Sequence, residues 1–150
     1  MPTPSLLRRL AALIYDSFLL IALIFAWIAI VIGINVWLVG EDQVKQATLA
    51  APPWAVWLGI VIVIVGFYTY FWRKSGQTLG MQAWRIKTQQ PNGERLSYQQ
   101  CLVRIASGAL SWACLGLGYL WALGPSKKTW HDIASNSQVV LLPKESRKKD

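Results

Sequence analysis

The sequence contains few charged residues and few of the side chains that build metal and disulfide sites. Only 15% of its 150 residues are charged, and it has two cysteines and one histidine. Cys101 and Cys114 fit neither a disulfide framework nor a metal-ligand spacing, and His131 has no histidine partner. Nothing resembles a nucleophile beside a base or a phosphate-binding loop. We therefore expect no enzyme activity, no metal site and no cofactor.

Charged side chains are absent from three long apolar segments. Residues 17–38, 54–72 and 105–124 contain no Asp, Glu, Lys or Arg over 22, 19 and 20 positions. A helix needs ~20 such residues to cross ~30 Å of hydrocarbon. The sequence therefore predicts an all-α membrane protein with one domain over residues 1–150. Its membrane segments are expected at about 10–38, 54–72 and 98–124.

The basic residues lie beside these apolar segments. The net charge is +8, but the lysines and arginines form no single stripe interleaved with aromatic residues. This arrangement favours the phosphates of anionic lipid headgroups over nucleic acid as the partner. The apolar stretch after Arg8 and Arg9 is longer than the 7–15 residues of a signal peptide, so we expect the first helix to be retained.

The distribution of Lys and Arg predicts which segments share one side of the membrane. The N-terminal tail has two, the segment 73–100 has five and the C-terminal tail has six, whereas the first loop has one. The positive-inside rule places the N-terminus, the loop 73–97 and the tail in the cytoplasm. Three full crossings cannot do that. The favoured solution is a two-piece segment that returns to the same side, broken between Trp112 and Cys114. The other is a third span with the tail outside.

The polar segments carry several local signals. Residues 39–53 are expected to form a loop, and residues 143–150 a charged tail. Alternation predicts a strand over 83–88, followed by a turn at Asn92-Gly93. Ser97 and Gln100 fit a capping box that starts the third helix. A helical turn over 130–134 and a strand over 137–142 follow, and this strand is expected to pair with the first as a small cytoplasmic β element.

Asp16 is the most informative charge, because it lies inside an apolar helix where a charge is costly. Arg9 is seven residues earlier and on the same helical stripe, but about 10.5 Å away in rise, too far for an intrahelical pair. Arg104 is the only other charge within an apolar helix and is the attractive partner. Two hypotheses remain open: a buried pair that fixes the helices, or a carboxylate that titrates or binds a cation during transport.

These residues resemble the motifs of the RDD family of small bacterial membrane proteins, named for an arginine and two aspartates. RRLAALIYD supplies Arg9 and Asp16, and LVRIA supplies the arginine of the third segment, Arg104. SGQTLGMQAWRIKT supplies Gly76, Thr78 and Gly80, although Met81 stands where a basic residue is common. WHDIASNSQVV supplies His131 and the second aspartate, Asp132.

The resemblance implies a bacterial inner-membrane protein, and the positive-inside rule places its N-terminus in the cytoplasm. It also implies ion transport, with cation/proton exchange as one form. Asp16 would then carry a proton or monovalent cation, and Arg9, Arg104 and Asp132 would set its charge state. Two or three helices cannot enclose a pathway alone, so this hypothesis requires a homo-oligomer. Small residues at Ala22, Ala26, Ala29 and Gly33 would permit close helix approach. The rival hypothesis is a structural or assembly module without transport.

Overall fold

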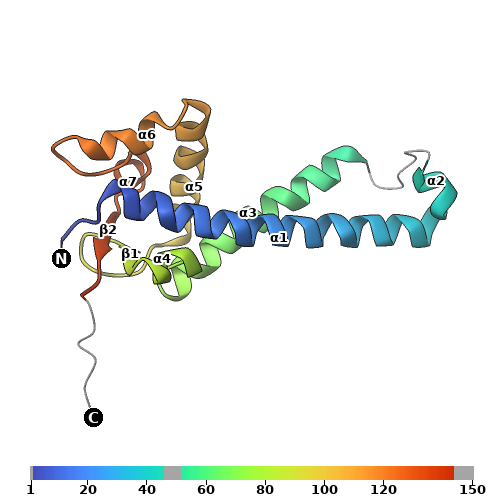
Figure 1. Cartoon of the computed structure of the whole chain (residues 1–150), viewed down its shortest axis with the longest axis horizontal. Coiled ribbons are helices and arrows are strands. Elements are labelled where there is room, and N and C mark those ends of the chain that lie inside the picture. The colour runs from blue at the N-terminus through green and yellow to red at the C-terminus, as the bar shows by residue number, and fades with distance from the viewer. Residues whose placement is uncertain (1, 46–51, 144–150) are drawn as a thin grey trace, which may run out of the picture. The chain divides into compact units, whose positions relative to one another are not determined.

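The computed structural model describes residues 2–45 and 52–143. The elements are the helices α1 (Leu6–Val39), α2 (Glu41–Lys45), α3 (Pro53–Lys74), α4 (Leu79–Ala83), α5 (Tyr98–Ala113), α6 (Leu117–Leu120), η1 (Trp121–Leu123, a 3-10 helix) and α7 (Trp130–Ala134), and the strands β1 (Ile86–Gln89) and β2 (Gln138–Leu141) (Figure 1). The described chain is thus mainly helical, with one small sheet, as the sequence predicts.

In the described part of the chain, two helices are long and apolar enough to cross a membrane. These are α1, with 34 residues, and α3, with 22 residues. Both extend slightly beyond the predicted spans 10–38 and 54–72. The chain divides into two compact units, one formed by Met1–Asp16 with Tyr68–Asp150 and the other by Ser17–Phe67. We call the first the charged unit, because it contains Arg9, Asp16, Arg104 and Asp132.

The prediction of a loop over 39–53 is wrong at residues 41–45, which form α2. Glu41 and Asp42 lie in its first turn and Lys45 in its last, so its charges complement the helix dipole. Residues 46–51 and the tail residues 144–150 lie outside the described residues.

The two strands pair antiparallel, and this pairing confirms the predicted β element. Ile86 lies opposite Leu141 and Gln89 opposite Gln138. The predicted first strand is wrong at its start, because Ala83 ends α4 and Arg85 has a positive φ of 54°. The backbone N–H of Leu141 donates to the carbonyl of Pro2 at 2.9 Å. The N-terminal residues therefore lie beside β2.

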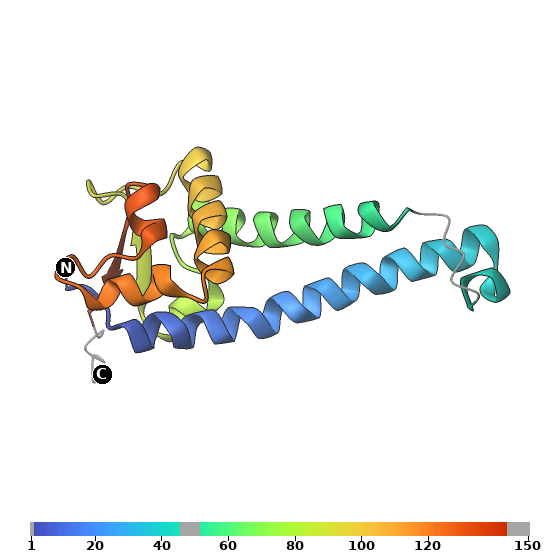
Figure 2. The same ribbon diagram turned by 90° about the horizontal axis from the view of Figure 1, so that it is seen from above.

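The third apolar segment is broken, which confirms its predicted division into two helical pieces. The α5 helix begins at the predicted capping box, with Ser97 and Gln100 bonded reciprocally. Leu115 and Gly116 then take positive φ values of 54° and 80°, which no continuous helix allows. The second piece begins at Leu117 rather than Cys114, and it is bent by 108° from α5, a corner visible in Figure 2.

A small apolar core holds the charged unit together. Its buried members come from both long helices, from α4, from the strands and from the residues around the start of α5: Ala12, Trp72, Met81, Ile86, Leu96, Cys101 and Val139. Elements far apart in the sequence therefore pack around the first turns of α1, and they bring the four charged residues of the predicted set into one unit.

Candidate functional site

Asp132 lies at the centre of a buried cluster of charges. Arg9 Nη1 is 2.6 Å from its Oδ2, and Arg104 Nη1 is 2.7 Å from its Oδ1. The side chains of the three residues are 0%, 6% and 4% exposed. Two guanidinium groups from α1 and α5 thus share one carboxylate from α7. We call these three residues the Asp132 cluster.

Each member of the Asp132 cluster has further partners in the chain. Arg9 Nη2 donates to the carbonyl of Lys127 at 3.1 Å, and Arg104 Nη1 donates to the hydroxyl of Ser137 at 2.5 Å. The Arg104 guanidinium also lies 5.3 Å from the Trp72 ring centroid, within cation–π range. The cluster therefore links α1 and α5 to the residues on both sides of α7.

Asp132 has a second role as a helix cap. Thr129 is the N-cap of α7; its hydroxyl accepts from the Asp132 N–H, and its own N–H donates to Asp132 Oδ2 at 3.1 Å. Burial alone would raise the pKa of Asp132, but Arg104, with His131 and Arg9, lowers it well below its usual range. The carboxylate is therefore charged, and it fixes the start of α7 against two arginines.

His131 is buried next to this cluster. Its ring lies 4.9 Å from the Tyr119 ring between centroids, and its Nε2 is 4.0 Å from Asp132 Oδ1. Burial, followed by the charges of Arg104 and Arg9, lowers the pKa of His131 to about 3, although the Asp132 charge opposes this shift. At neutral pH His131 is therefore an uncharged packing residue.

We expect acid to destabilise the fold through His131. Its pKa is about 3 when folded and 6.5 in the reference state, so the unfolded chain binds one more proton below about pH 6.5. Stability should fall by roughly 2 kcal/mol between about pH 6.5 and pH 5. Unfolding of wild type and His131→Gln in detergent at both pH values tests this. The variant, which lacks the only histidine, should lose most of the dependence; an equal dependence in both would contradict the assignment.

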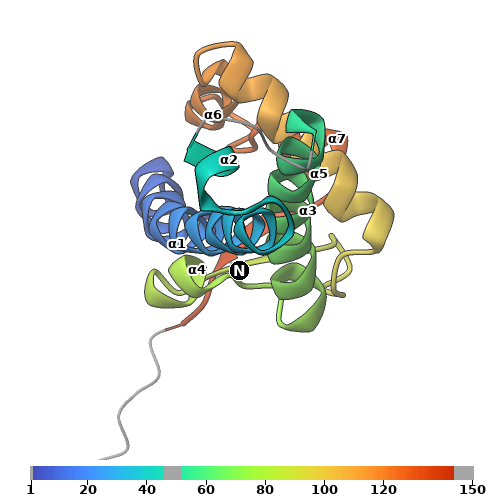
Figure 3. The same cartoon turned by 90° about the vertical axis from the view of Figure 1, so that its right-hand side faces the viewer.

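Asp16 lies in a different environment, on the turn of α1 that faces α4. The Gly80 N–H donates to its Oδ1 at 2.9 Å, and the Thr78 hydroxyl donates to its Oδ2 at 2.5 Å. Thr78 is the N-cap of α4, and its oxygen also accepts from the Met81 N–H. Both oxygens of the buried carboxylate therefore face donors from the start of α4, which lies beside the first turns of α1 (Figures 1 and 3).

The glycines of the predicted motif allow these contacts. A Cβ on Gly80 would lie 2.2 Å from the Ala12 carbonyl oxygen, so only glycine lets α4 approach α1 this closely. Gly76 has a φ of +75°, and its carbonyl accepts from the Thr88 N–H of β1 at 2.8 Å. The motif Gly76, Thr78 and Gly80 is therefore the segment that binds Asp16 and leads into the sheet.

The predicted pairing of Asp16 with Arg104 is wrong. Arg104 pairs with Asp132 instead, and no lysine or arginine pairs with Asp16 in residues 2–45 and 52–143. The Asp16 carboxyl instead binds two protein donors, the Thr78 hydroxyl and the Gly80 N–H. The prediction that Arg9 and Asp16 do not pair with each other is consistent with the structure. Both lie on the same face of α1, but Arg9 binds Asp132 of α7 and Asp16 binds the start of α4.

Three contributors to the site were not predicted. Thr129 caps α7, Ser137 binds Arg104, and the Lys127 carbonyl binds Arg9. A sequence signal existed for Thr129, because Thr-Trp-His-Asp fits the capping-box pattern with an acidic residue at the third helical position. The other two contacts depend on tertiary structure and leave no local pattern.

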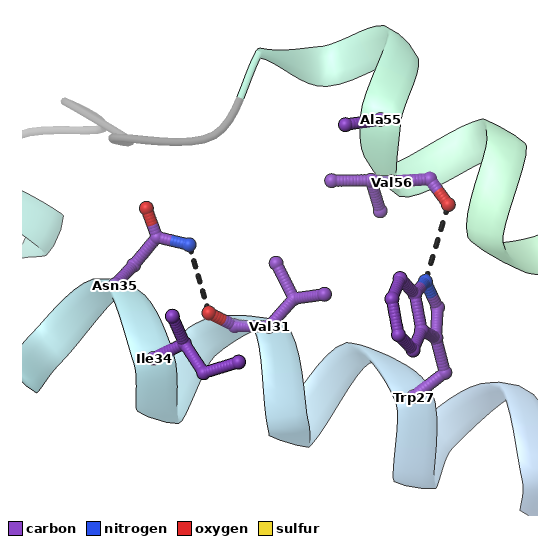
Figure 4. Close-up of a pocket in the computed structure, with 6 residues that line it drawn as sticks. All are labelled: Trp27, Val31, Ile34, Asn35, Ala55 and Val56. Carbon is purple, nitrogen blue, oxygen red and sulfur yellow. Dashed lines mark hydrogen bonds between the residues drawn. The ribbon is translucent and has the colours of Figure 1, made fainter.

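A hollow lies between α1 and α3 within the unit Ser17–Phe67, and it has a volume of about 210 Å³ (Figure 4). Trp27 Nε1 donates to the Val56 carbonyl at 3.2 Å, and Asn35 Nδ2 donates to the Val31 carbonyl at 2.8 Å. Its remaining lining residues are Ile34 and Ala55. Among the residues that the structure describes, the lining of the hollow thus includes no charged side chain.

Fold and site together define a membrane protein in which Asp16 of the long helix α1 binds the start of α4, and Arg9 of α1 and Arg104 of α5 bind Asp132 of α7. A protein-family model, described as the RDD family, matches residues 3–136. The chain therefore belongs to the RDD family, as its motifs predict. Comparisons with curated proteins and with solved structures gave no significant match.

Proposed function

We propose that this chain is a membrane assembly module without catalytic activity, in which the charged set holds the short helices α4 and α7 against α1 and α5. One observation carries the proposal: the oxygens of both buried aspartates face partners from the chain itself. Asp16 binds the start of α4, and Asp132 binds Arg9, Arg104 and the start of α7. Groups arranged in this way stabilise a fold without exchanging a ligand.

The orientation we propose follows from the basic residues. The charged unit contains nearly all the described lysines and arginines, whereas Lys45 lies on α2 between the two long helices. The positive-inside rule then supports a bacterial inner-membrane protein whose N-terminus faces the cytoplasm. Anionic lipid headgroups would be the partners of the exposed basic side chains.

A homo-oligomer is the assembly we propose for this module. Ala22, Ala26, Ala29 and Gly33 are all exposed on α1. Small residues at this spacing let helix backbones approach closely inside a membrane, where packing drives association. A helix of a second copy would fit this face.

Ion transport is the second candidate, and Asp16 is the observation that favours it. A carboxylate inside an apolar membrane helix, with no cation paired to it among the described residues, is a feature of proton and cation pathways. To act as a carrier in cation/proton exchange, however, Asp16 would have to release both Thr78 and Gly80. Transport would therefore require α4 to move at each cycle.

Flux measurements with Asp16→Asn distinguish the two functions. Asparagine keeps the shape of the side chain but removes its charge, so it cannot exchange a proton. The assembly proposal predicts equal cation-driven proton flux, at the level of empty liposomes, for wild-type and Asp16→Asn proteoliposomes. It also predicts a lower melting temperature for the variant, because a charged acceptor of two donors is lost. Flux in the wild type that disappears in Asp16→Asn would instead establish transport.

A further inference from the structure

Beyond its first turn, the helix α5 has Arg104 and Ser111 on its buried side and apolar residues on its exposed side. Cys101, Arg104 and Ser111 are buried on the inward side, at 0%, 5% and 0% exposure. Tyr98 and Gln99 are exposed in the first turn, and from Leu102 onward the exposed residues of α5 are all apolar: Leu102, Ala106, Ala109, Leu110, Trp112 and Ala113. This is the reverse of a helix on the surface of a water-soluble domain, where the polar face is outward.

The apolar surface continues across the break into the second piece. Leu115, at the corner between the pieces, is 94% exposed. The exposed side chains that follow are Leu117, Leu120, Trp121 and Leu123, each at least half exposed. An apolar surface of this extent is unfavourable in water, and it marks contact with protein or with hydrocarbon. We call the segment 98–123 the hairpin.

The residues before the hairpin contact the residues after it, so the two ends of the hairpin lie close together. Strand β1 precedes the hairpin and β2 follows it, and the two are hydrogen-bonded neighbours. Arg104, in the second turn of α5, pairs with Asp132 after the hairpin. If the hairpin crossed the membrane once, β1 and β2 would lie on opposite sides and could not pair. The bend of 108° between the pieces accounts for the reversal.

We infer that the hairpin is a re-entrant segment that enters the leaflet next to the charged unit and leaves on the same side, with lipid acyl chains covering its apolar surface. The 16 residues of α5 span about 24 Å, which is less than the ~30 Å hydrocarbon core. Basic residues flank the hairpin at both ends, Arg95 before it and Lys127 and Lys128 after it, where lipid phosphates lie. The inference does not depend on whether the module transports an ion.

Single cysteines at exposed positions test this topology in the full-length protein. The background is Cys114→Ala, with the fully buried Cys101 kept, and the background protein serves as the blank. Ser126→Cys lies after the hairpin, Asn92→Cys lies before it, and Gln43→Cys lies on α2 between the two spans. A membrane-impermeant maleimide is applied to sealed vesicles of each orientation. We expect Ser126→Cys and Asn92→Cys to react from one side, and Gln43→Cys from the other.

The corner residue tests insertion. Leu115→Cys should not react with the maleimide from either side of the membrane. A nitroxide attached to this cysteine should be more accessible to oxygen than to a water-soluble nickel complex. Labelling of Ser126→Cys from the same side as Gln43→Cys would overturn the proposal, because the segment would then be a third span. Labelling of Leu115→Cys from the side of Asn92→Cys would also overturn it, since the hairpin would lie outside the hydrocarbon.

Discussion

Replacing Asp132 with asparagine is expected to destabilise the protein by about 3–5 kcal/mol, because it leaves two buried guanidinium groups without their carboxylate. Arg9 and Arg104 are almost completely shielded from water, and both pair with this side chain at under 3 Å. Their positive charges would then face each other with no negative charge between them. The variant also weakens the capping box of α7, in which Asp132 accepts from Thr129.

Thermal or denaturant unfolding in detergent measures this loss, with Asp42→Asn as the matched control. Asp42 is exposed on α2, so its replacement should change stability by less than about 0.5 kcal/mol. The double variant Arg9→Gln with Asp132→Asn should lose less than the sum of the two single variants, because the two side chains interact directly. Additive losses, or an Asp132→Asn protein as stable as the control, would show that the cluster does not hold the fold.

Gly80→Ala is expected to produce the second large effect. Its Cβ would lie 2.2 Å from the Ala12 carbonyl oxygen, 2.9 Å from Tyr15 Cβ and 3.0 Å from Asp16 Oδ1. The carbonyl belongs to the backbone of α1 and cannot rotate away, so α4 must move outward. That movement lengthens the bond from the Gly80 N–H to Asp16. Overpacking typically costs about 1–3 kcal/mol, and a lost hydrogen bond to a charged group costs a similar amount.

Gly108→Ala is the control for this substitution. Gly108 lies within α5, and a Cβ there meets nothing within 4 Å. Alanine has the higher helix propensity, so this variant should be as stable as the wild type or slightly more stable. The melting temperatures of the two variants provide the comparison. If the Gly80→Ala protein had the same melting temperature as the Gly108→Ala protein, close contact between α4 and α1 would be excluded.

The sequence predicts the long helices well because their signal is local. A run of apolar residues of membrane length determines α1 and α3 almost to their ends. The break in the third segment was predictable from the distribution of basic residues, although the position of the break was not. The start of the first strand was wrong because alternation over 83–88 cannot reveal that Thr78 caps a helix reaching to Ala83.

The charged residues were predictable as a set, but their pairing was not. A buried charge must find a partner, so Asp16 and Arg104, as the charges within apolar helices, are a natural pair by elimination. The structure shows that the partners of Asp16 are the Gly80 N–H and the Thr78 hydroxyl. These donors are uncharged, so a search of the sequence for charged partners does not find them. Asp132 lies in a polar segment, where its burial becomes visible only after the tertiary fold has formed.

Hydrogen–deuterium exchange in lipid nanodiscs tests most directly whether Asp16 and Asp132 hold the short helices α4 and α7 against α1 and α5. Asp16→Ala removes the acceptor of the Gly80 N–H, so amides of α4 should exchange about tenfold faster or more, since a bond to a charged group contributes about 1.5–3 kcal/mol. Amides of α7, which Asp132 fixes, should keep their wild-type rates in this variant. Wild-type exchange rates throughout α4 in Asp16→Ala would contradict the account.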